Sequence, residues 1–202
     1  MAKFGKQRFP EGYQRLVGMK EDTEGLKRLH DNSKELVKII TKNNILNKNS
    51  KVFELGAGPG RNLYYIYEAF GCKSIFCNDL YERGSLRHMS PKLKEVITFY
   101  EGDSADIIDN NIIDNLNLFI SSDHLMHLEY SKAKHIIKQI NKSWKPDFIL
   151  LRELKKEYEK VDHPRLYHNY DKFLDYYDLV YETSSLQDNA YFIWLLKRKN
   201  ND

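Results

Sequence analysis

The sequence contains little cysteine, few prolines and no long apolar run. Its two cysteines, Cys72 and Cys77, lack the spacing of a zinc or redox motif, so we expect reduced, half-buried thiols and no disulfide framework. No apolar stretch approaches the ~20 residues of a membrane span. The first residues also lack the apolar centre of a signal peptide. We therefore expect a cytoplasmic protein without a membrane partner.

Neither sign of charge dominates the chain. Its 202 residues include 32 basic and 29 acidic side chains, which gives a net charge of +3. Such a weak field does not favour nucleic acid, which is not expected as a partner. The hydrophobic content of 41% is enough for one buried core at this length. We expect a single domain over residues 1–202, in which residues 1–45 form an N-terminal helical layer or lid.

Apolar periodicity predicts strands that alternate with helices. A helix over 24–43 comes first. Five strands follow, at 51–55, 74–78, 96–100, 117–122 and 147–152, with helices between them at 61–69, 82–89, 104–110 and 131–143. Such an alternation predicts an α/β fold whose parallel sheet is covered by helices on both faces.

The last part of the sequence breaks this alternation. A helix is predicted over 169–177, followed by strands at 178–184 and 190–197. Only five residues, SLQDN, separate these two strands. Because a right-handed crossover needs a longer connection, the two strands are expected to pair antiparallel.

Residues 52–62, VFELGAGPGRN, join a predicted strand to a predicted helix through three glycines. Gly56 and Gly58 permit positive φ and let a ligand approach bare backbone, while Gly60 lets the helix begin close to the strand. A dinucleotide-binding fingerprint needs its third glycine one residue later, where this chain has Arg61. The spacing therefore points away from NAD.

The segment instead resembles motif I of the class I S-adenosylmethionine (SAM) dependent methyltransferases, hydrophobic-hydrophobic-(Glu/Asp)-x-Gly-x-Gly-x-Gly. The parallel sheet with a terminal antiparallel hairpin looks like the sheet of that family, and the resemblance covers roughly residues 24–198. SSDHLMHLEY (121–130) resembles the motif after strand four of its small-molecule group. The resemblance implies a Rossmann-like three-layer sandwich with a seven-stranded, mostly parallel sheet, and SAM as cofactor.

The resemblance also implies a cofactor site at the carboxyl ends of the strands, where open parallel sheets bind ligands. The residues expected there are Glu54, Gly56, Ala57, Gly58, Gly60, Asn62, Asp79, Leu80, Asp103, Ser104, Ser122 and Asp123.

Three acidic residues in this set each have a second interpretation. Asp79, 19 residues after Gly60, could accept both ribose hydroxyls or form a capping box with Glu82. Asp103 could meet the adenine amino group, with help from its neighbour Ser104, or cap the next helix. Glu54 could lie near the methionine amino group or only brace the glycine turn, since a buried charge needs partners.

Two histidines are candidate catalytic residues. His124 and His127 are three apart on one face of a short helical turn, and either could act as general base for an acceptor hydroxyl or amine. Either could instead be a packed, hydrogen-bonded group.

Substrate contacts are expected from Tyr13, Glu153, His163 and His168, which belong to the N-terminal segment, the end of strand five and the loop after it. Histidine and carboxylate spacing typical of a metal site is missing from the sequence, so no metal is expected.

The leading hypothesis is methyl transfer from SAM to an oxygen or nitrogen of a small molecule, which mainly requires alignment and exclusion of water. Signatures of three other methyltransferase groups are missing. The segment after strand four has neither the Pro-Pro-aromatic motif of amino-directed nucleic-acid enzymes nor the paired glutamates of arginine-methylating enzymes. Neither cysteine follows a proline, as the nucleophile of carbon-5 cytosine enzymes would. RNA or protein methylation stays an alternative, as does a protein that cleaves or senses the cofactor.

Overall fold

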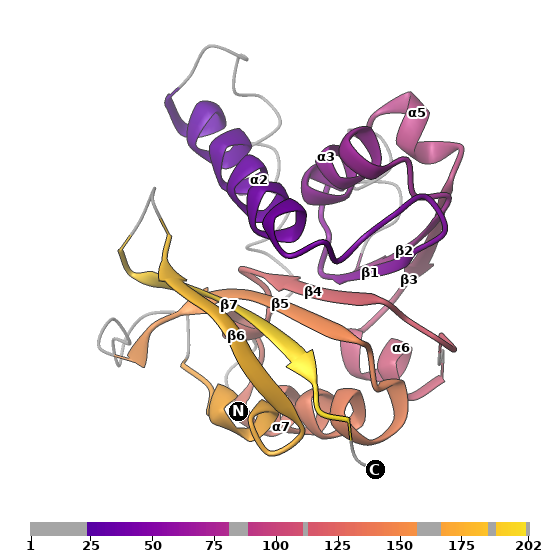
Figure 1. Ribbon diagram of the computed structural model, residues 1–202. Coiled ribbons are helices and arrows are strands. Elements are labelled where there is room, and N and C mark those ends of the chain that lie inside the picture. The colour runs from indigo at the N-terminus through magenta and orange to yellow at the C-terminus, as the bar shows by residue number, and fades with distance from the viewer. Residues whose placement is uncertain (1–23, 81–88, 111–112, 157–166, 186–188, 201–202) are drawn as a thin grey trace.

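A mixed sheet with strand order β3-β2-β1-β4-β5-β7-β6 runs through the molecule (Figure 1). The computed structural model describes residues 24–80, 89–110, 113–156, 167–185 and 189–200. Five strands are parallel, namely β1 (Lys51–Leu55), β2 (Ser74–Asp79), β3 (Ile97–Glu101), β4 (Leu118–Ser122) and β5 (Phe148–Leu154). The last two, β6 (Tyr177–Ser184) and β7 (Tyr191–Arg198), form a hairpin, and β7 pairs antiparallel with β5.

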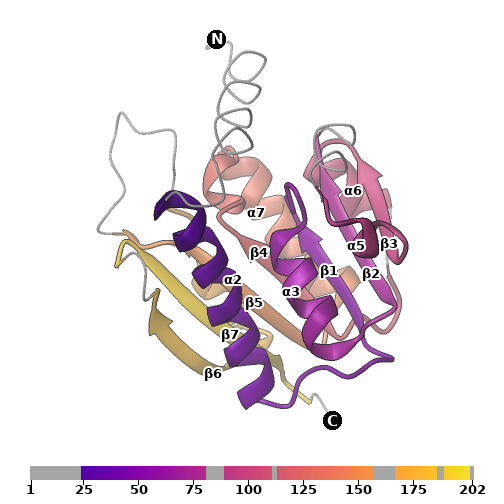
Figure 2. The ribbon, with the colours of Figure 1, turned by 90° about the horizontal axis from the view of Figure 1, so that it is seen from above.

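Helices cover both faces of this sheet (Figures 1 and 2). On one face lie α2 (Glu24–Lys42), α3 (Arg61–Phe70) and the short α5 (Pro91–Lys94). On the other lie α6 (Ser104–Asn110) and α7 (Tyr130–Gln139), which continues into a π-helical turn, η2 (Ile140–Trp144). The result is a three-layer α/β sandwich.

The central strands are apolar on both sides because both sides are covered. In β1, Val52 belongs to the core beneath α2 and α3, whereas the next residue, Phe53, belongs to the core above α6 and α7. Leu36 and Ile40 of α2 are buried in the first of these cores. The described part of α2 is thus integrated into the core.

The order of connections reverses between β1 and β4, which are neighbours in the sheet but far apart in the chain. At such a point the loops leave in opposite directions and open a crevice beyond the carboxyl ends of the strands. The glycine turn after β1 and the segment after β4 lie together at this edge of the sheet.

The predicted seven-stranded, mostly parallel sheet with a terminal hairpin is confirmed. The helix predicted over 169–177 is wrong, because the chain forms only a short 3-10 helix, η4 (Tyr170–Phe173), and β6 begins at Tyr177. Tyr170, Phe173 and Tyr177 are all buried. Their spacing imitates a helical stripe, but the last of them is buried as a strand residue. The helix predicted over 82–89 lies, except for its last residue, outside the described residues.

Both cysteines are free thiols. Cys72 and Cys77 are fully buried, not half-buried as predicted, and burial raises the pKa of both. Among the helices within the described ranges, none is long and apolar enough to cross a membrane.

Candidate active site

The glycine turn after β1 adopts a backbone that only glycine takes up easily. Gly56, Gly58 and Gly60 have φ values of 66°, 55° and 69°. A methyl group on Gly56 would lie 2.0 Å from Nδ1 of His124, and one on Gly60 would lie 2.7 Å from Cε of Met89. The turn is therefore packed closely between the segment after β4 and the side chain of Met89.

The end of β2 holds this turn in place. Asp79 Oδ2 accepts the Gly58 N–H at 2.8 Å and Oδ1 accepts the Leu80 N–H at 2.7 Å, while the Ala57 N–H donates to the Asn78 carbonyl at 3.0 Å. Asp79 therefore ties the end of β2 to the backbone of the glycine turn. The Leu80 side chain, just beyond Asp79, is 44% exposed.

Glu54 is a buried carboxylate beside the turn, and its side chain is only partly satisfied. Its residue is 2% exposed, and Oε1 accepts a hydrogen bond of 2.6 Å from Nδ2 of Asn62. Within the described part of the chain, Oε2 is buried without a hydrogen-bond partner. Burial raises the pKa of Glu54 to about 8, although the Asn62 hydrogen bond acts in the opposite direction. An unpaired buried carboxylate oxygen fits an incoming ammonium group, such as that of the methionine part of SAM.

Ser104 links His124 to buried Asn78 at the carboxyl edge of the sheet. Asn78 donates to the Gly102 carbonyl at 2.8 Å and accepts from the Ser104 hydroxyl at 2.9 Å. Ser104 Oγ also lies 2.8 Å from Nε2 of His124. Because the hydroxyl proton goes to Asn78, this network assigns the Nε2 proton to His124. The imidazole ring of His124, held in this way, packs directly against Gly56.

The protonation behaviour of His124 argues against its role as a general base. Desolvation of the ring and then the charge of His127 lower the pKa of His124 to about 4. Catalytic bases work best with a pKa near the operating pH. His127, in contrast, is exposed on the 3-10 helix η1 (Leu125–His127), so the packed-core interpretation of His127 is not what the structure shows.

Asp103 caps α6. Its Oδ1 accepts the Ala105 N–H at 3.0 Å, and its Oδ2 pairs with Lys132 Nζ of α7 at 2.5 Å. Partial burial opposes ionisation, but the hydrogen bond and charge of Lys132 prevail and hold the pKa of Asp103 below its ordinary value. Contact with adenine stays a prediction for Asp103.

The segment after β4 is anchored by an ion pair that sequence reasoning missed. Asp123, at φ 59°, pairs with Arg152 of β5 and donates its N–H to the Arg152 carbonyl at 2.8 Å. The Arg152 guanidinium is buried and lies 4.4 Å from the centre of the Tyr191 ring. Ser122, just before Asp123, is partly exposed at the end of β4.

Glu153 and His168 support η1 from inside. Oxygens of Glu153 accept from Ser121 Oγ at 2.6 Å, from the Leu125 N–H at 3.1 Å and from the Met126 N–H at 3.2 Å. His168 Nε2 donates to the Leu125 carbonyl at 2.7 Å. Burial raises the pKa of Glu153 to about 7. Both residues are buried, so substrate contact by either stays a prediction without support from these contacts.

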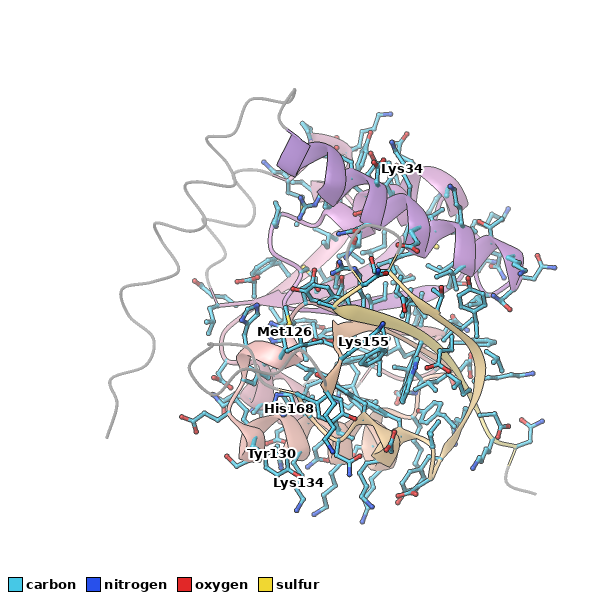
Figure 3. The ribbon with its side chains drawn as sticks, turned by 90° about the vertical axis from the view of Figure 1, so that its left-hand side faces the viewer. Lys34, Met126, Tyr130, Lys134, Lys155 and His168 are labelled. Atoms are coloured by element: carbon cyan, nitrogen blue, oxygen red, sulfur yellow. The ribbon has the colours of Figure 1, made fainter. Side chains whose placement is uncertain are left out.

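Figure 3 looks onto this edge of the sheet, with Lys34 of α2 above Met126, and His168 and Tyr130 below it. The structure brings together the glycine turn, Asp79, Glu54 with Asn62, and His124. The predicted substrate contacts Tyr13 and His163 lie outside the described residues.

No family model matches the sequence, and no curated protein matches it. Several solved structures are similar. Magnesium protoporphyrin IX methyltransferase (ChlM) from Synechocystis PCC 6803, with bound SAM, is 15% identical with a TM-score of 0.70, over 96% of this chain and 92% of that chain. N-methyltransferase NodS from Bradyrhizobium japonicum WM9, in complex with S-adenosyl-L-homocysteine, is 11% identical with a TM-score of 0.67, over 94% and 98%.

A third similar structure is small RNA methyltransferase HEN1, which is 15% identical with a TM-score of 0.61, over 84% of this chain and 26% of that chain. Identities this low establish the fold alone. The chain has the Rossmann-like fold of the class I SAM-dependent methyltransferases.

Proposed function

We propose that the protein is a SAM-dependent methyltransferase that acts on an oxygen or nitrogen of a small-molecule acceptor. The observation that carries this proposal is the unpaired Oε2 of Glu54, buried beside a turn of three glycines whose backbone is hydrogen-bonded to Asp79. A ligand that joins an ammonium group to an adenosyl group matches these two features, because the ammonium can pair with Glu54 and the adenosyl group can lie along the glycine turn. When bound, SAM supplies a methyl group that its sulfonium already activates.

The chain's own residues would then bind, orient and enclose this ligand. Glu54 would accept a hydrogen bond from the ammonium, and Asp79, which holds the backbone of the glycine turn, would accept from the ribose hydroxyls. His124 and Ser104 form a fixed wall, since both are held by the Asn78 network. Groups that are hydrogen-bonded in place before the ligand arrives align the reacting atoms with less reorganisation.

His127 is the better candidate for proton removal from the acceptor. It is exposed at the carboxyl edge, whereas His124 is engaged with Ser104 and has a lowered pKa. Glu153 accepts hydrogen bonds from the backbone of the turn that carries His127, so the imidazole projects from a backbone that is held in place.

Methylation of RNA is the second candidate, and the similarity to small RNA methyltransferase HEN1 is the observation that favours it. The small-molecule proposal ranks first because the matches to ChlM and NodS cover more than nine-tenths of both chains. Cleavage or sensing of SAM is a third outcome that product analysis distinguishes.

Calorimetric titration with SAM, S-adenosylhomocysteine and NAD tests the cofactor site. We expect saturable binding of the two adenosyl-sulfur ligands and none of NAD. Asp79→Asn should weaken binding at least tenfold, about 1.4 kcal/mol, while Asp114→Asn on the exposed surface serves as the matched control. NAD binding, or equal behaviour of the two variants, would overturn the assignment.

Acceptor screening by mass spectrometry then separates the candidate functions. A methylated small molecule supports the first proposal, and methylated RNA supports the second. Methylthioadenosine or adenosine formed without a methylated acceptor would identify cleavage of the cofactor.

A further inference from the structure

We propose that Ser33 of α2 is a positioning residue of the cofactor site, which acts through Asn62 to orient Glu54 toward the ligand's ammonium group. This inference rests on the proposed function. It adds a residue from the N-terminal helix, which no motif in the sequence links to the cofactor, and it explains why a polar side chain occupies a buried position on α2.

Three elements meet in a short chain of hydrogen bonds. Ser33 Oγ of α2 donates to Oδ1 of Asn62 on α3 at 2.6 Å, and Nδ2 of Asn62 donates to Oε1 of Glu54 on β1 at 2.6 Å. Ser33 and Glu54 are 1% and 2% exposed. Asn62 itself is only partly buried, and these two short hydrogen bonds, one to each end of its amide, leave the amide little freedom.

The direction of the Asn62 amide decides which form of Glu54 is favoured. With the amide NH₂ toward Glu54, the carboxylate is favoured, because an ionised carboxylate only accepts hydrogen bonds. With the amide reversed, its carbonyl would face Glu54, and only the protonated acid could donate to it. Ser33 donates its hydroxyl proton to the Asn62 carbonyl, which matches the first arrangement, whereas in the reversed one the hydroxyl would have to turn and accept from the amide NH₂.

Other charged groups around Glu54 act on the same equilibrium. Asp79 and Asp123 oppose ionisation of Glu54, and Arg61 of α3 favours it. Cys77 is its neighbour across the β1–β2 pairing and has a raised pKa itself. These groups leave burial as the largest influence, and burial disfavours the carboxylate. An arriving ammonium needs the ionised form, so binding of the amino-acid part should release a proton, and Ser33 should make that release easier.

Two ligands separate this role from general support of the fold. S-adenosylhomocysteine carries the ammonium, whereas 5′-methylthioadenosine shares the adenosyl and thioether groups but lacks the amino-acid part. Calorimetry between pH 6.5 and 8.5 on the full chain, in two buffers of different ionisation enthalpy, gives affinity and proton release together. The variants are Ser33→Ala, Asn62→Ala and the double variant, with Thr41→Ala as control, since Thr41 is an exposed hydroxyl on the same helix that donates to the Val37 carbonyl.

We expect Ser33→Ala to weaken S-adenosylhomocysteine binding about fivefold, as loss of one hydrogen bond implies. The pH midpoint of binding should rise, and methylthioadenosine affinity should change less than about twofold. In the Asn62→Ala background, Ser33→Ala should have no further effect, because its action passes through Asn62. Thr41→Ala should behave as the parent.

Three results would overturn the proposal: equal weakening of both ligands, an unchanged pH midpoint, or additive effects of Ser33→Ala and Asn62→Ala. A Ser33→Ala protein whose melting temperature falls while its affinities and pH midpoint stay at parent values would also contradict it, since Ser33 would then be structural only. Failure of the cofactor assignment on which this inference rests looks different, because the parent protein would then bind neither adenosyl ligand.

Discussion

Two glutamates, Glu54 and Glu153, are both buried but differ in their hydrogen-bond partners. This difference, rather than burial, distinguishes a structural glutamate from one that can bind a ligand. Glu153 receives donors from the Ser121 hydroxyl and from successive backbone N–H groups, so both its oxygens are used. Glu54 receives one donor, from Asn62, and keeps one oxygen unpaired. A buried polar atom without a partner costs free energy. Glu54 therefore has an oxygen, Oε2, that can still accept a hydrogen bond from a ligand, whereas both oxygens of Glu153 already have donors.

Gly56 gives a direct test of the close contact between the turn and His124. Gly56→Ala should lower the free energy of unfolding by about 3 kcal/mol, because a side chain at positive φ is strained and the new methyl group collides with the imidazole ring. Adding His124→Ala removes the collision but not the strain. Urea unfolding of both single variants and the double variant should give a favourable coupling of at least about 1 kcal/mol. Additive losses would mean that the ring and the turn are not in contact.

At the scale of elements, the strands and the helices over 61–69 and 104–110 were well predicted, whereas the helix over 169–177 was not. The prediction of 51–55 matches β1, since its apolar residues run directly into the glycine turn. The helix predicted over 169–177 failed because Tyr170, Phe173 and Tyr177 carry the spacing of a helix while serving different elements. Aromatic burial alone does not distinguish a helix from a turn followed by a strand.

The residues of the candidate site also divide into those that the sequence could place and those that it could not. Glycines, Asp79 and Glu54 could be placed from the sequence because each lies at the end of a predicted strand. Ser33 and Arg152 could not, because each pairs with a residue 29 positions away, Asn62 and Asp123 respectively. Contacts of that range depend on how α2 and β5 pack, which local pattern does not encode.

The packing of α2 predicts that it unfolds with the domain and does not act as a separate lid. Ile40 is fully buried in the core with Leu36, so Ile40→Ala should lower the free energy of unfolding by about 2–5 kcal/mol. Lys38→Ala, an exposed change on the same helix, should stay within about 0.5 kcal/mol. Chemical denaturation followed by tryptophan fluorescence measures both. If Ile40→Ala left the global transition unchanged, α2 would be a detachable layer.

At the scale of the whole molecule, three titratable groups with a shifted pKa lie together at the carboxyl edge of the sheet, while others, such as Cys72 and Tyr177, lie elsewhere. The three are Glu54, Glu153 and His124, and burial is the main cause of the pKa shift of each. Their shifts make the stability of the domain depend on pH. His124 has a lowered pKa, so its contribution is complete above about pH 6.5 and is lost only as the pH falls toward 4.

Between pH 6.5 and 8.5, the raised pKa of Glu54 should therefore dominate the pH dependence of stability. Its folded-state pKa of about 8 exceeds the ordinary value of 4.5, so the folded state holds a proton that the unfolded state has released. Stability is then lost as the pH rises through 8, and the free energy of unfolding should fall by about 2 kcal/mol across this interval. Glu153, with a pKa of about 7, contributes in the same direction mainly in the lower half of the interval.

Glu54→Gln isolates the contribution of Glu54, because the amide carbonyl can still accept from Asn62 but cannot ionise. Urea unfolding at pH 6.5, 7.5 and 8.5 should show a decline in the parent between the two higher values that is nearly absent in Glu54→Gln. A parent whose stability is flat or rises with pH would contradict a protonated, buried Glu54. Saturating S-adenosylhomocysteine should abolish the decline in the parent, because an ammonium beside Glu54 favours the carboxylate and moves its titration below the interval.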